Sequence, residues 1–427
     1  MQKKQADVNK NIRLSHYSSY QYKFITVYLK YYFIFAGLII TFNDMISRFS
    51  TEKLIRYIDR FPCVAIVGPR QVGKTTLSKE IIKKIKKKHS VIYLDLELNS
   101  DLDKLQNAQY FLSQHEDSLV VIDEVQRMPQ LFPLIRALID KKRKGARFLL
   151  LGSAAPDLIR DSSESLAGRI IYCELGPISL LETKQIDKLW LKGGFPEAFL
   201  EKDEEFYNAW MNGFVRTYME SDLVQLGFKG NVSKAQKLWS MLAHYHGNII
   251  HYTELAKSLD VSVPTVQSYV EFLEKAFLIR LLPAYSGNLK KRLVKSPKVY
   301  VRDSGILHYF LNIKSKNDLL SHPKLGASWE GFVIEQIIAK FGNDYSYSFY
   351  RSQDGAEIDF IIEKGAKSLL AIEIKLGADF KISKGNFSAC EAIKASKNLV
   401  VTKENEKFKL NEKFEVINLM QFLESEM

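Results

Sequence analysis

The stretch Gly68–Thr76, with the sequence GPRQVGKTT, constrains the fold of this chain more than any other. It matches G-x-x-x-x-G-K-[ST], the pattern of a loop that wraps the phosphates of a nucleoside triphosphate. Glycine lets backbone N–H groups approach the phosphate oxygens, and the N-terminus of a following helix adds a favourable dipole. The apolar run CVAIV precedes the loop and a helical pattern follows it, so the sequence predicts a strand–loop–helix unit.

Each polar position of this loop has an expected role. The Lys74 ammonium would reach the β- and γ-phosphates, and the Thr75 hydroxyl would ligate Mg²⁺. The sequence therefore predicts ATP and Mg²⁺ as cofactors. The residues expected to contact them are Gly68, Pro69, Arg70, Gln71, Val72, Gly73, Lys74, Thr75, Thr76 and, further along the chain, Asp123.

Composition sets wider bounds. With 427 residues, 46% hydrophobic and 26% charged, the chain is typical of a soluble globular protein of several domains. Residues 1–44 carry six Lys/Arg and two Asp/Glu, so they hold +4 of the net charge of +12 and leave +8 for the rest. This excess points mildly to a polyanionic partner. Three distant cysteines form neither a disulfide framework nor a zinc spacing, so a cytoplasmic location is expected.

Residues 1–44 differ in character from the remainder. Residues 24–42 are apolar and aromatic, but Lys30 interrupts them, and the uninterrupted part is too short for a standard membrane span. A signal-anchor remains an alternative because basic residues precede the segment. We expect a dispensable extension or a mis-called start, with Met45 as the natural start, and no stable membrane association. Folding and ATP binding should then not require residues 1–44.

From Met45 the chain alternates between short apolar strands and helical stretches. Such alternation predicts an α/β domain with a parallel sheet that helices cover on both faces. The expected strands are 64–67, 91–96, 119–123, 148–152 and 170–175, and the expected helices include 79–88 and 131–142.

Three further segments add candidate catalytic groups. LVVIDE ends a strand with Asp123, which can hold Mg²⁺, and Glu124, which can polarise the attacking water. FLLLGS ends a strand with Ser153, whose hydroxyl would sense the γ-phosphate or cap a helix. Arg169 is a candidate charge-stabilising arginine, in cis or toward a neighbouring subunit, and Arg160 is its rival.

Several motifs occur in a specific order: GPRQVGKTT, VVIDEVQRMP, LLLGSA, ESLAGR with LGPISLLE, GGFPEAFL, FVRTYMESDL, SPKVYVRDSGILHYF, and GAEIDFII with IEIK. Together they resemble the prokaryotic AAA-type ATPases that carry a C-terminal domain of unknown function, itself similar to restriction-type nucleases. The resemblance runs from about Met45 to about Leu376. It implies an AAA-type P-loop NTPase domain and ATP binding, and it leaves the biological role open.

We expect five regions: an extension at 1–44, the ATPase domain at 45–189, a helical connector at 190–230, a winged helix at 231–315 and a nuclease-like α/β domain at 316–427. In the winged helix, Ser262 would cap the recognition helix. The outward face of that helix lacks Arg and Lys until Lys275, and such a helix reads DNA poorly. Basic residues gather just after it, and this tract would contact nucleic acid: Lys290, Lys291, Arg292, Lys295 and Lys298.

The tail holds a second chemical pattern. Asp359 lies in GAEIDFII, and Glu373 and Lys375 lie in the following strand pattern IEIK. An aspartate followed by E-x-K on a neighbouring strand is the arrangement of restriction-type nucleases, in which carboxylates hold Mg²⁺ and the lysine orients or deprotonates water. Glu330 is a candidate further ligand, with Glu335 as its alternative.

Two functional hypotheses follow. In the first, an ATPase, acting alone or as a homo-oligomer, drives a winged helix and a nuclease-like region that act on nucleic acid. In the second, the C-terminal domains are inactive docking modules of a nucleotide-dependent interaction protein. The intact Asp359, Glu373 and Lys375 favour the first hypothesis, and the weakly basic recognition helix favours the second.

Overall fold

The computed structural model describes residues 46–153, 166–286 and 295–425, apart from 366 and 378. Every element described below lies within one compact unit, residues 48–427. The expected N-terminal extension, Arg160 and three residues of the basic tract, 290–292, lie outside the described residues.

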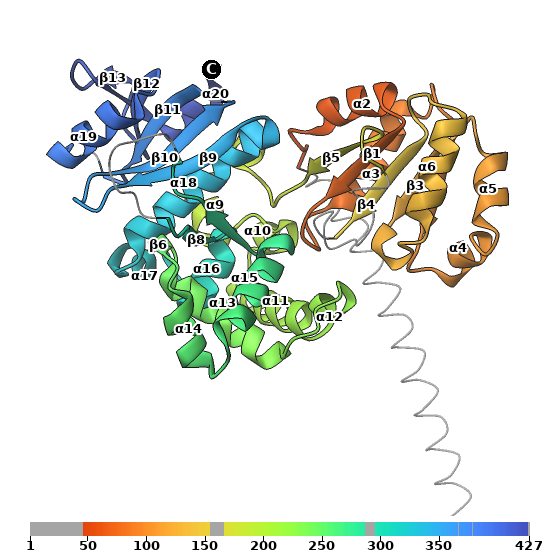
Figure 1. Ribbon diagram of the computed structural model, residues 1–427, viewed down its shortest axis with the longest axis horizontal. Helices are drawn as coiled ribbons and strands as arrows, with labels where there is room; N and C mark the ends of the chain where they lie inside the picture. Colours follow the sequence, from red (N-terminus) through yellow and green to blue (C-terminus); the bar gives the residue numbers. More distant parts are fainter. Residues whose placement is uncertain (1–45, 154–165, 287–294, 366, 378, 426–427) are drawn as a thin grey trace, which may run out of the picture. The chain divides into compact units, whose positions relative to one another are not determined.

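A five-stranded parallel sheet forms the first part of this unit (Figure 1). Its strand order is β2-β3-β4-β1-β5, so β1 lies between β4 and β5. The five strands coincide with the five expected from the sequence, within one residue at each end. Their bounds are β1 Cys63–Val67, β2 Val91–Asp95, β3 Leu119–Asp123, β4 Phe148–Gly152 and β5 Ile170–Glu174.

Both faces of this sheet are buried, as the near-continuous apolar strands predict. All five residues of β1, of β3 and of β4 are buried. Alternate strand residues, with Val120 and Ile122 among them, pack in one core with the apolar face of α6. The associated helices are α2 Thr51–Arg60, α3 Lys74–Ile85, α4 Asn99–Lys104, α5 Ala108–Gln114, a 3₁₀ turn Val125–Arg127 and α6 Leu131–Lys141.

The region after β5 is mainly helical. Asp203 caps its longest helix by accepting hydrogen bonds from two backbone N–H groups of the first turn, at Glu205 and Phe206. The last turn runs into a π-helical stretch, Tyr218–Asp222. The helices are α8 Leu180–Thr183, α9 Ile186–Lys192, α10 Pro196–Leu200, α11 Glu204–Thr217 and α12 Leu223–Gln225.

Three helices and a three-stranded antiparallel sheet follow, in the order β6-β8-β7. Ser262 caps α15 by accepting a hydrogen bond from Thr265 N, as expected, and a proline lies in the first turn. These are the elements that a winged helix combines, and that assignment stays a prediction. Their bounds are α13 Val232–Tyr245, β6 Asn248–Ile249, α14 Tyr252–Leu259, α15 Val263–Lys275, β7 Ile279–Leu282 and β8 Lys298–Val301.

The tail contains a six-stranded mixed sheet with the order β13-β14-β12-β11-β10-β9. Strands β9, β10 and β11 pair antiparallel, whereas β11, β12 and β14 pair parallel. No helix of the described residues is long and apolar enough to cross a membrane. The remaining elements are α16 Ser304–Phe310, α17 Lys316–Ser321, α18 Leu325–Phe341, a 3₁₀ turn Gly342–Asp344, β9 Ser346–Arg351, β10 Glu357–Lys364, β11 Lys367–Ile374, α19 Lys384–Ile393, β12 Lys397–Thr402, β13 Phe408–Lys409, β14 Phe414–Asn418 and α20 Leu419–Glu424.

The alternation expected from GAEIDFII, with Glu357 and Asp359 on one face and Ile358, Phe360 and Ile362 on the other, does not hold throughout β10. Simple alternation would put Ile358 and Phe360 on one face of the strand. Instead, Ile358 and Ile361 both belong to the core cluster that contains Ala371. The pairing of β10 with β9 shifts its register between Ile358 and Ile361, and such an irregularity breaks the two-residue period.

Buried polar contacts join the regions that the expected boundaries separate. Trp190 Nε1 donates to Ser328 Oγ at 3.0 Å, and Ser328 Oγ lies 2.7 Å from His308 Nε2. The other ring nitrogen of His308 lies 2.9 Å from the carbonyl oxygen of Leu191. Burial lowers the pKa of His308 to about 4, so the ring is neutral near pH 7. These buried hydrogen bonds therefore connect the connector, the middle region and the tail.

Asp303 makes a second junction of this kind. Its carboxylate accepts hydrogen bonds from Gly194 N at 2.7 Å and from Ile306 N at 3.0 Å, which caps α16. Gly193 has a φ of 77°, and a Cβ added there would lie 2.2 Å from Asp303 Oδ1. Position 193, in the segment GGFP, therefore has to be glycine, because a side chain there would collide with Asp303 in the segment RDSG.

We predict that Gly193→Ala lowers the free energy of unfolding by about 2–4 kcal/mol, because the methyl group meets the Asp303 carboxylate in a strained backbone conformation. Gly213→Ala is the matched control, since Gly213 lies in α11 and an added Cβ there meets no atom within 4 Å. That control should change stability by no more than about 1 kcal/mol, in the stabilising direction. Urea unfolding midpoints measure both, and equal midpoints for the two variants would contradict the steric argument.

Candidate functional site

The phosphate loop leaves β1 at Val67 and enters α3 at Lys74. Gly68 is required by close packing, since a Cβ there would lie 2.1 Å from Leu175 O. Gly73 has a φ of 90°, a left-handed conformation that glycine adopts readily. The Lys74 ammonium donates to Gly68 O at 3.1 Å and to Pro69 O at 2.8 Å. Burial lowers the pKa of Lys74 to about 8, and Glu124 and Asp123 oppose this shift.

The predicted magnesium-binding pair lies beside the loop. Thr75 Oγ1 donates to Asp123 Oδ2 at 2.7 Å, and the Tyr93 hydroxyl donates to the same oxygen at 2.5 Å. Burial raises the pKa of Tyr93, and the hydrogen bond to Asp123 raises it further. A hydroxyl and a carboxylate side by side are oxygen donors of the kind that Mg²⁺ prefers, so these residues fit the ion. Tyr93 was not predicted.

Glu124 follows Asp123 in a left-handed conformation with a φ of 52°. Its carboxylate accepts hydrogen bonds from Ser153 Oγ at 3.1 and 3.2 Å and from the Gln126 side chain. The hydroxyl of Ser153 is thus joined to the candidate base at the end of β4. Gln126, two residues after Glu124 in VVIDEVQRMP, was missed although its amide helps to orient the carboxylate.

The structure does not support Arg169 as a charge-stabilising group for its own loop. Arg169 precedes β5, which pairs in parallel with β1, so it lies where the strands begin. The phosphate loop follows the strand ends, about 16 Å away for a five-residue strand. The guanidinium of Arg169 instead donates to the Asp140 carboxylate, from Nε to Oδ1 at 2.6 Å and from Nη2 to Oδ2 at 3.0 Å. A role toward a neighbouring subunit stays a prediction.

Two other arginines contact the loop region and were not predicted in these roles. Arg48 donates to Val72 O at 2.7 Å and forms an ion pair with Glu182 at 3.0 Å. Arg70, expected only as part of the loop, forms an ion pair with Asp222 at the end of the π-helical stretch. Asp222 therefore has a physical partner that the motif FVRTYMESDL alone did not indicate.

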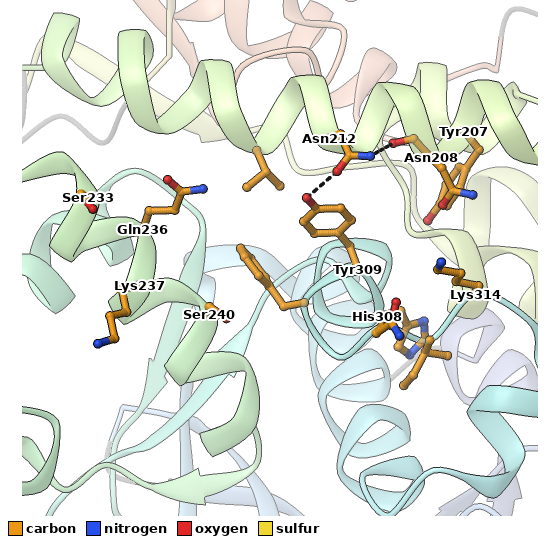
Figure 2. A pocket seen from close by; sticks show the side chains of 14 residues that line it. Tyr207, Asn208, Asn212, Ser233, Gln236, Lys237, Ser240, His308, Tyr309 and Lys314 are labelled. Atoms are coloured by element: carbon orange, nitrogen blue, oxygen red, sulfur yellow. Dashed lines mark hydrogen bonds between the residues drawn. The ribbon is translucent and has the colours of Figure 1, made fainter. Parts of the chain in front are cut away.

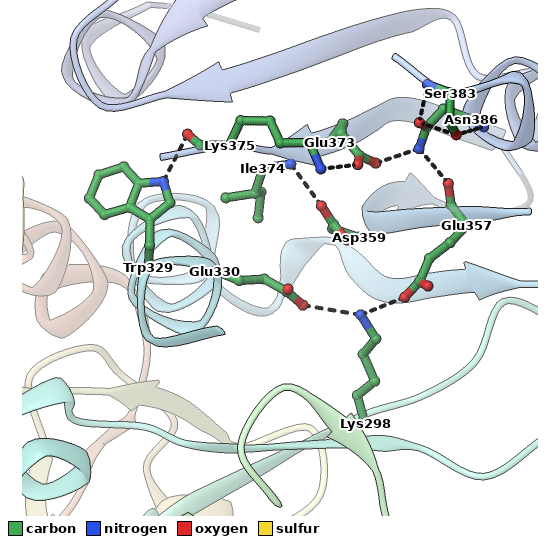
Figure 3. Close-up of polar contacts among 10 residues, drawn as sticks. All are labelled: Lys298, Trp329, Glu330, Glu357, Asp359, Glu373, Ile374, Lys375, Ser383 and Asn386. Atoms are coloured by element: carbon green, nitrogen blue, oxygen red, sulfur yellow. Dashed lines mark hydrogen bonds and ion pairs between the residues drawn. The ribbon is translucent and has the colours of Figure 1, made fainter. Parts of the chain in front are cut away.

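The tail residues predicted to form one site do meet. Asp359 on β10 and Glu373 on β11 lie on adjacent antiparallel strands, in line with the paired residues Phe360 and Ile372. Lys375 Nζ donates to Glu373 Oε1 at 2.7 Å, and Asp359 Oδ2 accepts from Ile374 N at 2.8 Å (Figure 3). Burial and the neighbouring Glu373 raise the pKa of Asp359 well above its usual range.

Glu330 of α18 also faces this group, but a lysine holds it. Lys298 Nζ lies 3.1 Å from Glu330 Oε1 and 2.9 Å from Glu357 Oε1, and Figure 3 shows it between the two carboxylates. Asn386 Nδ2 donates to Glu373 Oε2 at 2.9 Å. Within the described ranges, no three His, Cys, Asp or Glu side chains are arranged to hold a metal ion. As it stands, this tail cluster of Glu330, Glu357, Asp359, Glu373, Lys298 and Lys375 does not fit a divalent metal.

The alternative ligand, Glu335, is ruled out by its partners. Its carboxylate binds the guanidinium groups of Arg280 and Arg302. Burial alone would raise the pKa of Glu335, but these arginines outweigh it and lower the pKa to about 2. Five residues along a helix correspond to a rotation of about 140° from Glu330, which explains why the two point differently.

One member of the expected basic tract is unsuited to nucleic acid. Lys298 is 3% exposed and bound by two carboxylates, so its charge is not available to a phosphate backbone. The charge pattern failed here because Lys298 begins a fully buried strand. Lys295 is exposed, and its proposed role is untested.

A polar cavity of about 730 Å³ lies apart from both groups, among α11, α13 and the end of α16 (Figure 2). Tyr309 Oη donates to Asn212 Oδ1 at 2.7 Å, and Asn212 Nδ2 donates to Asn208 O at 2.9 Å. Figure 2 shows these two hydrogen bonds, which join the Tyr309 and Asn212 side chains and the Asn208 backbone carbonyl. Its polar groups are thus partly satisfied by one another.

Family comparisons agree with the geometry of the first site. Residues 60–184 match an AAA domain, residues 183–317 match a domain of unknown function (DUF8612), and residues 325–422 match another (DUF4143). The sheet, the loop and this match define an ATP-binding P-loop ATPase of the AAA type.

Relatives define the family more closely. An uncharacterized protein of Mycobacterium tuberculosis is 39% identical over 367 residues, which cover 86% of this chain and 82% of the relative. An uncharacterized protein of Methanocaldococcus jannaschii is 24% identical over 415 residues, covering 83% and 84%. The chain belongs to the family of the mycobacterial protein, an AAA domain followed by two domains of unknown function.

Similarity to solved structures is weaker. AMPPCP-bound DnaA from Aquifex aeolicus is 17% identical with a TM-score of 0.29, covering 54% of this chain and 90% of that chain. Cdc6p from Pyrobaculum aerophilum is 13% identical with a TM-score of 0.29, covering 64% and 97%. Scores this low carry no property of those proteins to this chain.

We predict that Asp359→Asn stabilises the protein more at pH 8 than at pH 5. Because the folded-state pKa of Asp359 is raised, ionisation opposes folding, and this cost grows as the pH rises above the unfolded pKa of about 3.9. Relief of a buried, poorly compensated charge is among the larger effects of single substitutions, so a gain of about 1 kcal/mol or more at pH 8 is expected. Urea unfolding at both pH values measures it, with the exposed Asp354→Asn as control. A gain that is independent of pH would contradict the argument.

Proposed function

We propose that the protein binds ATP with Mg²⁺ and hydrolyses it slowly. The observation that carries this proposal is the convergence of Lys74, Thr75, Asp123 and Glu124 at one edge of the sheet. Lys74 would hold the β- and γ-phosphates, and Thr75 and Asp123 would hold Mg²⁺, which neutralises charge on the phosphates when bound. Glu124, oriented by Ser153 and Gln126, would accept a proton from the attacking water.

We further propose that the C-terminal half acts on nucleic acid, with the tail cluster as a phosphodiester-cleaving site of the restriction-nuclease type. Support comes from Asp359, Glu373 and Lys375, which meet on adjacent strands of a mixed sheet. Further support comes from the net charge of +12.

A second candidate function is a nucleotide-dependent interaction protein whose C-terminal domains serve as docking modules. Two observations favour it. Carboxylates of the tail cluster already have partners: Glu330 is bound by a lysine, and Glu373 by a lysine and by the side-chain amide of Asn386. Helix α15 also carries no arginine and only one lysine, Lys275, at its last residue.

For the ATPase, we predict that Glu124→Gln binds ATP but lowers the turnover rate by a factor of about 10² or more, because the amide cannot accept the proton. Lys74→Ala should greatly weaken ATP binding, since it removes the ammonium that faces the phosphates. Nucleotide binding by calorimetry and phosphate release separate the two effects.

The exposed Glu412→Gln and Lys87→Ala are matched controls for these variants and should behave as wild type. Unchanged turnover in Glu124→Gln would remove Glu124 from the role of base. Unchanged affinity in Lys74→Ala would remove the loop from phosphate binding.

For the tail, the cleavage function predicts magnesium-dependent cleavage of single- or double-stranded DNA or RNA in a state in which Lys298 has left Glu330 and Glu357, because the arrangement described above does not fit the metal. Asp359→Ala and Glu373→Ala should each abolish cleavage and leave ATP hydrolysis largely intact, because the tail cluster lies on a sheet separate from the phosphate loop. Assays with and without ATP measure it. If none of these substrates is cleaved under either condition, the docking function is favoured instead.

A further inference from the structure

Lys298 reaches the tail cluster from outside the sheet that carries the acids. It begins β8, which pairs antiparallel with β6 and β7. Its ammonium binds Glu330 of α18 and Glu357 of β10 (Figure 3). A lysine from one sheet thus ties together a helix and a strand that belong to the tail.

We propose that Lys298 is the resident cation of the tail cluster and that its ammonium keeps divalent metal out. This inference rests on the proposed function of the tail cluster as a cleavage site, and it adds how that site is controlled. Metal could enter only when Lys298 is removed or withdrawn with β8.

The charges of the cluster support this role. Four carboxylates, from Glu330, Glu357, Asp359 and Glu373, surround two ammonium groups, from Lys298 and Lys375. Lys298 Nζ lies 3.1 Å from Glu330 Oε1 and 2.9 Å from Glu357 Oε1, so two carboxylates hold its positive charge inside the cluster. A divalent ion near Glu330 would meet this positive charge at close range, in a buried site where solvent screens little.

The hydrogen bonds around Glu330 point the same way. Glu330 Oε1 accepts from both Lys298 Nζ and the Tyr300 hydroxyl, which lie two residues apart on β8. The same strand therefore supplies two donors to an oxygen that a metal would need. This arrangement also explains why the acids converge without forming a metal site.

The test measures Mn²⁺ binding by electron paramagnetic resonance in the absence of nucleotide. Wild type should show no tight site that depends on Asp359. Lys298→Met, which keeps an unbranched side chain one atom shorter than lysine and removes its charge, should bind one Mn²⁺ at least tenfold more tightly than wild type. Asp359→Asn in that background should abolish the gain. Lys295→Met, a change in the exposed residue of the same segment, should behave as wild type.

Two results would overturn the inference: tight binding by wild type that Asp359→Asn removes, or a folded Lys298→Met with the affinity of wild type. If Lys298→Met does not fold, Lys298→Gln takes its place, and Mn²⁺ should raise its unfolding midpoint but not that of wild type. Equal midpoint shifts would overturn the inference. Mn²⁺ binding by the variant without any cleavage would support the inference and contradict only the cleavage function.

Discussion

Parallel pairing in the five-stranded sheet is the constraint on which the nucleotide site depends. Because β1 and β3 both pair in parallel with β4, all three strands end at one edge. The chain places the phosphate loop, Asp123 with Glu124, and Ser153 directly after these ends. Residues 48 and 29 positions apart in the sequence thereby come within hydrogen-bond distance, as Thr75 with Asp123 and Glu124 with Ser153 show. The same constraint separates Arg169 from the loop, since it precedes its strand.

The acids of the tail cluster are not gathered at an open strand edge: Asp359 and Glu373 are buried, and Glu330 and Glu357 are partly buried. Buried carboxylates cost stability unless a charge or a hydrogen bond compensates them. Glu330 and Glu357 share Lys298, and Glu373 has Lys375 and Asn386. Asp359 has one backbone donor, Ile374 N, and its raised pKa reflects this weaker compensation. Partial compensation of this kind is typical of functional sites, where charge is kept despite its cost.

The sequence predicted what depends on local patterns. Apolar runs of four to six residues located all five strands of the first sheet. The run is continuous in β1, β3 and β4 because these strands are buried on both faces. Gly68 and Gly73 were assigned to the loop from their spacing, and the structure adds the reasons: close packing against Leu175 at Gly68 and a φ of 90° at Gly73. Beyond the loop, the candidate site residues were predicted one by one, without the hydrogen-bond partners that hold them in place.

What the sequence did not reveal depends on distant pairing. Tyr93, Asp222 and Asn386 acquire their partners only when separate elements pack, and no periodicity encodes such contacts. The choice between Glu330 and Glu335 depended on which side of α18 faces the tail cluster, and the sequence does not show this. Charge counting misplaced Lys298 because the count cannot distinguish a surface lysine from one that opens a buried strand.

The two buried lysines of the candidate sites show how partners decide function. Lys74 donates to two neutral carbonyl oxygens, so its charge is left uncompensated by direct contact and burial lowers its pKa to about 8. Lys298 donates to two carboxylates, and its pKa is raised. A phosphate group that approached Lys74 would supply the missing negative charge and bind strongly. A phosphate that approached Lys298 would compete with two carboxylates already in place. The phosphate loop is therefore prepared for an anion. The tail cluster could take up a divalent metal ion only after the Lys298 ammonium had left it.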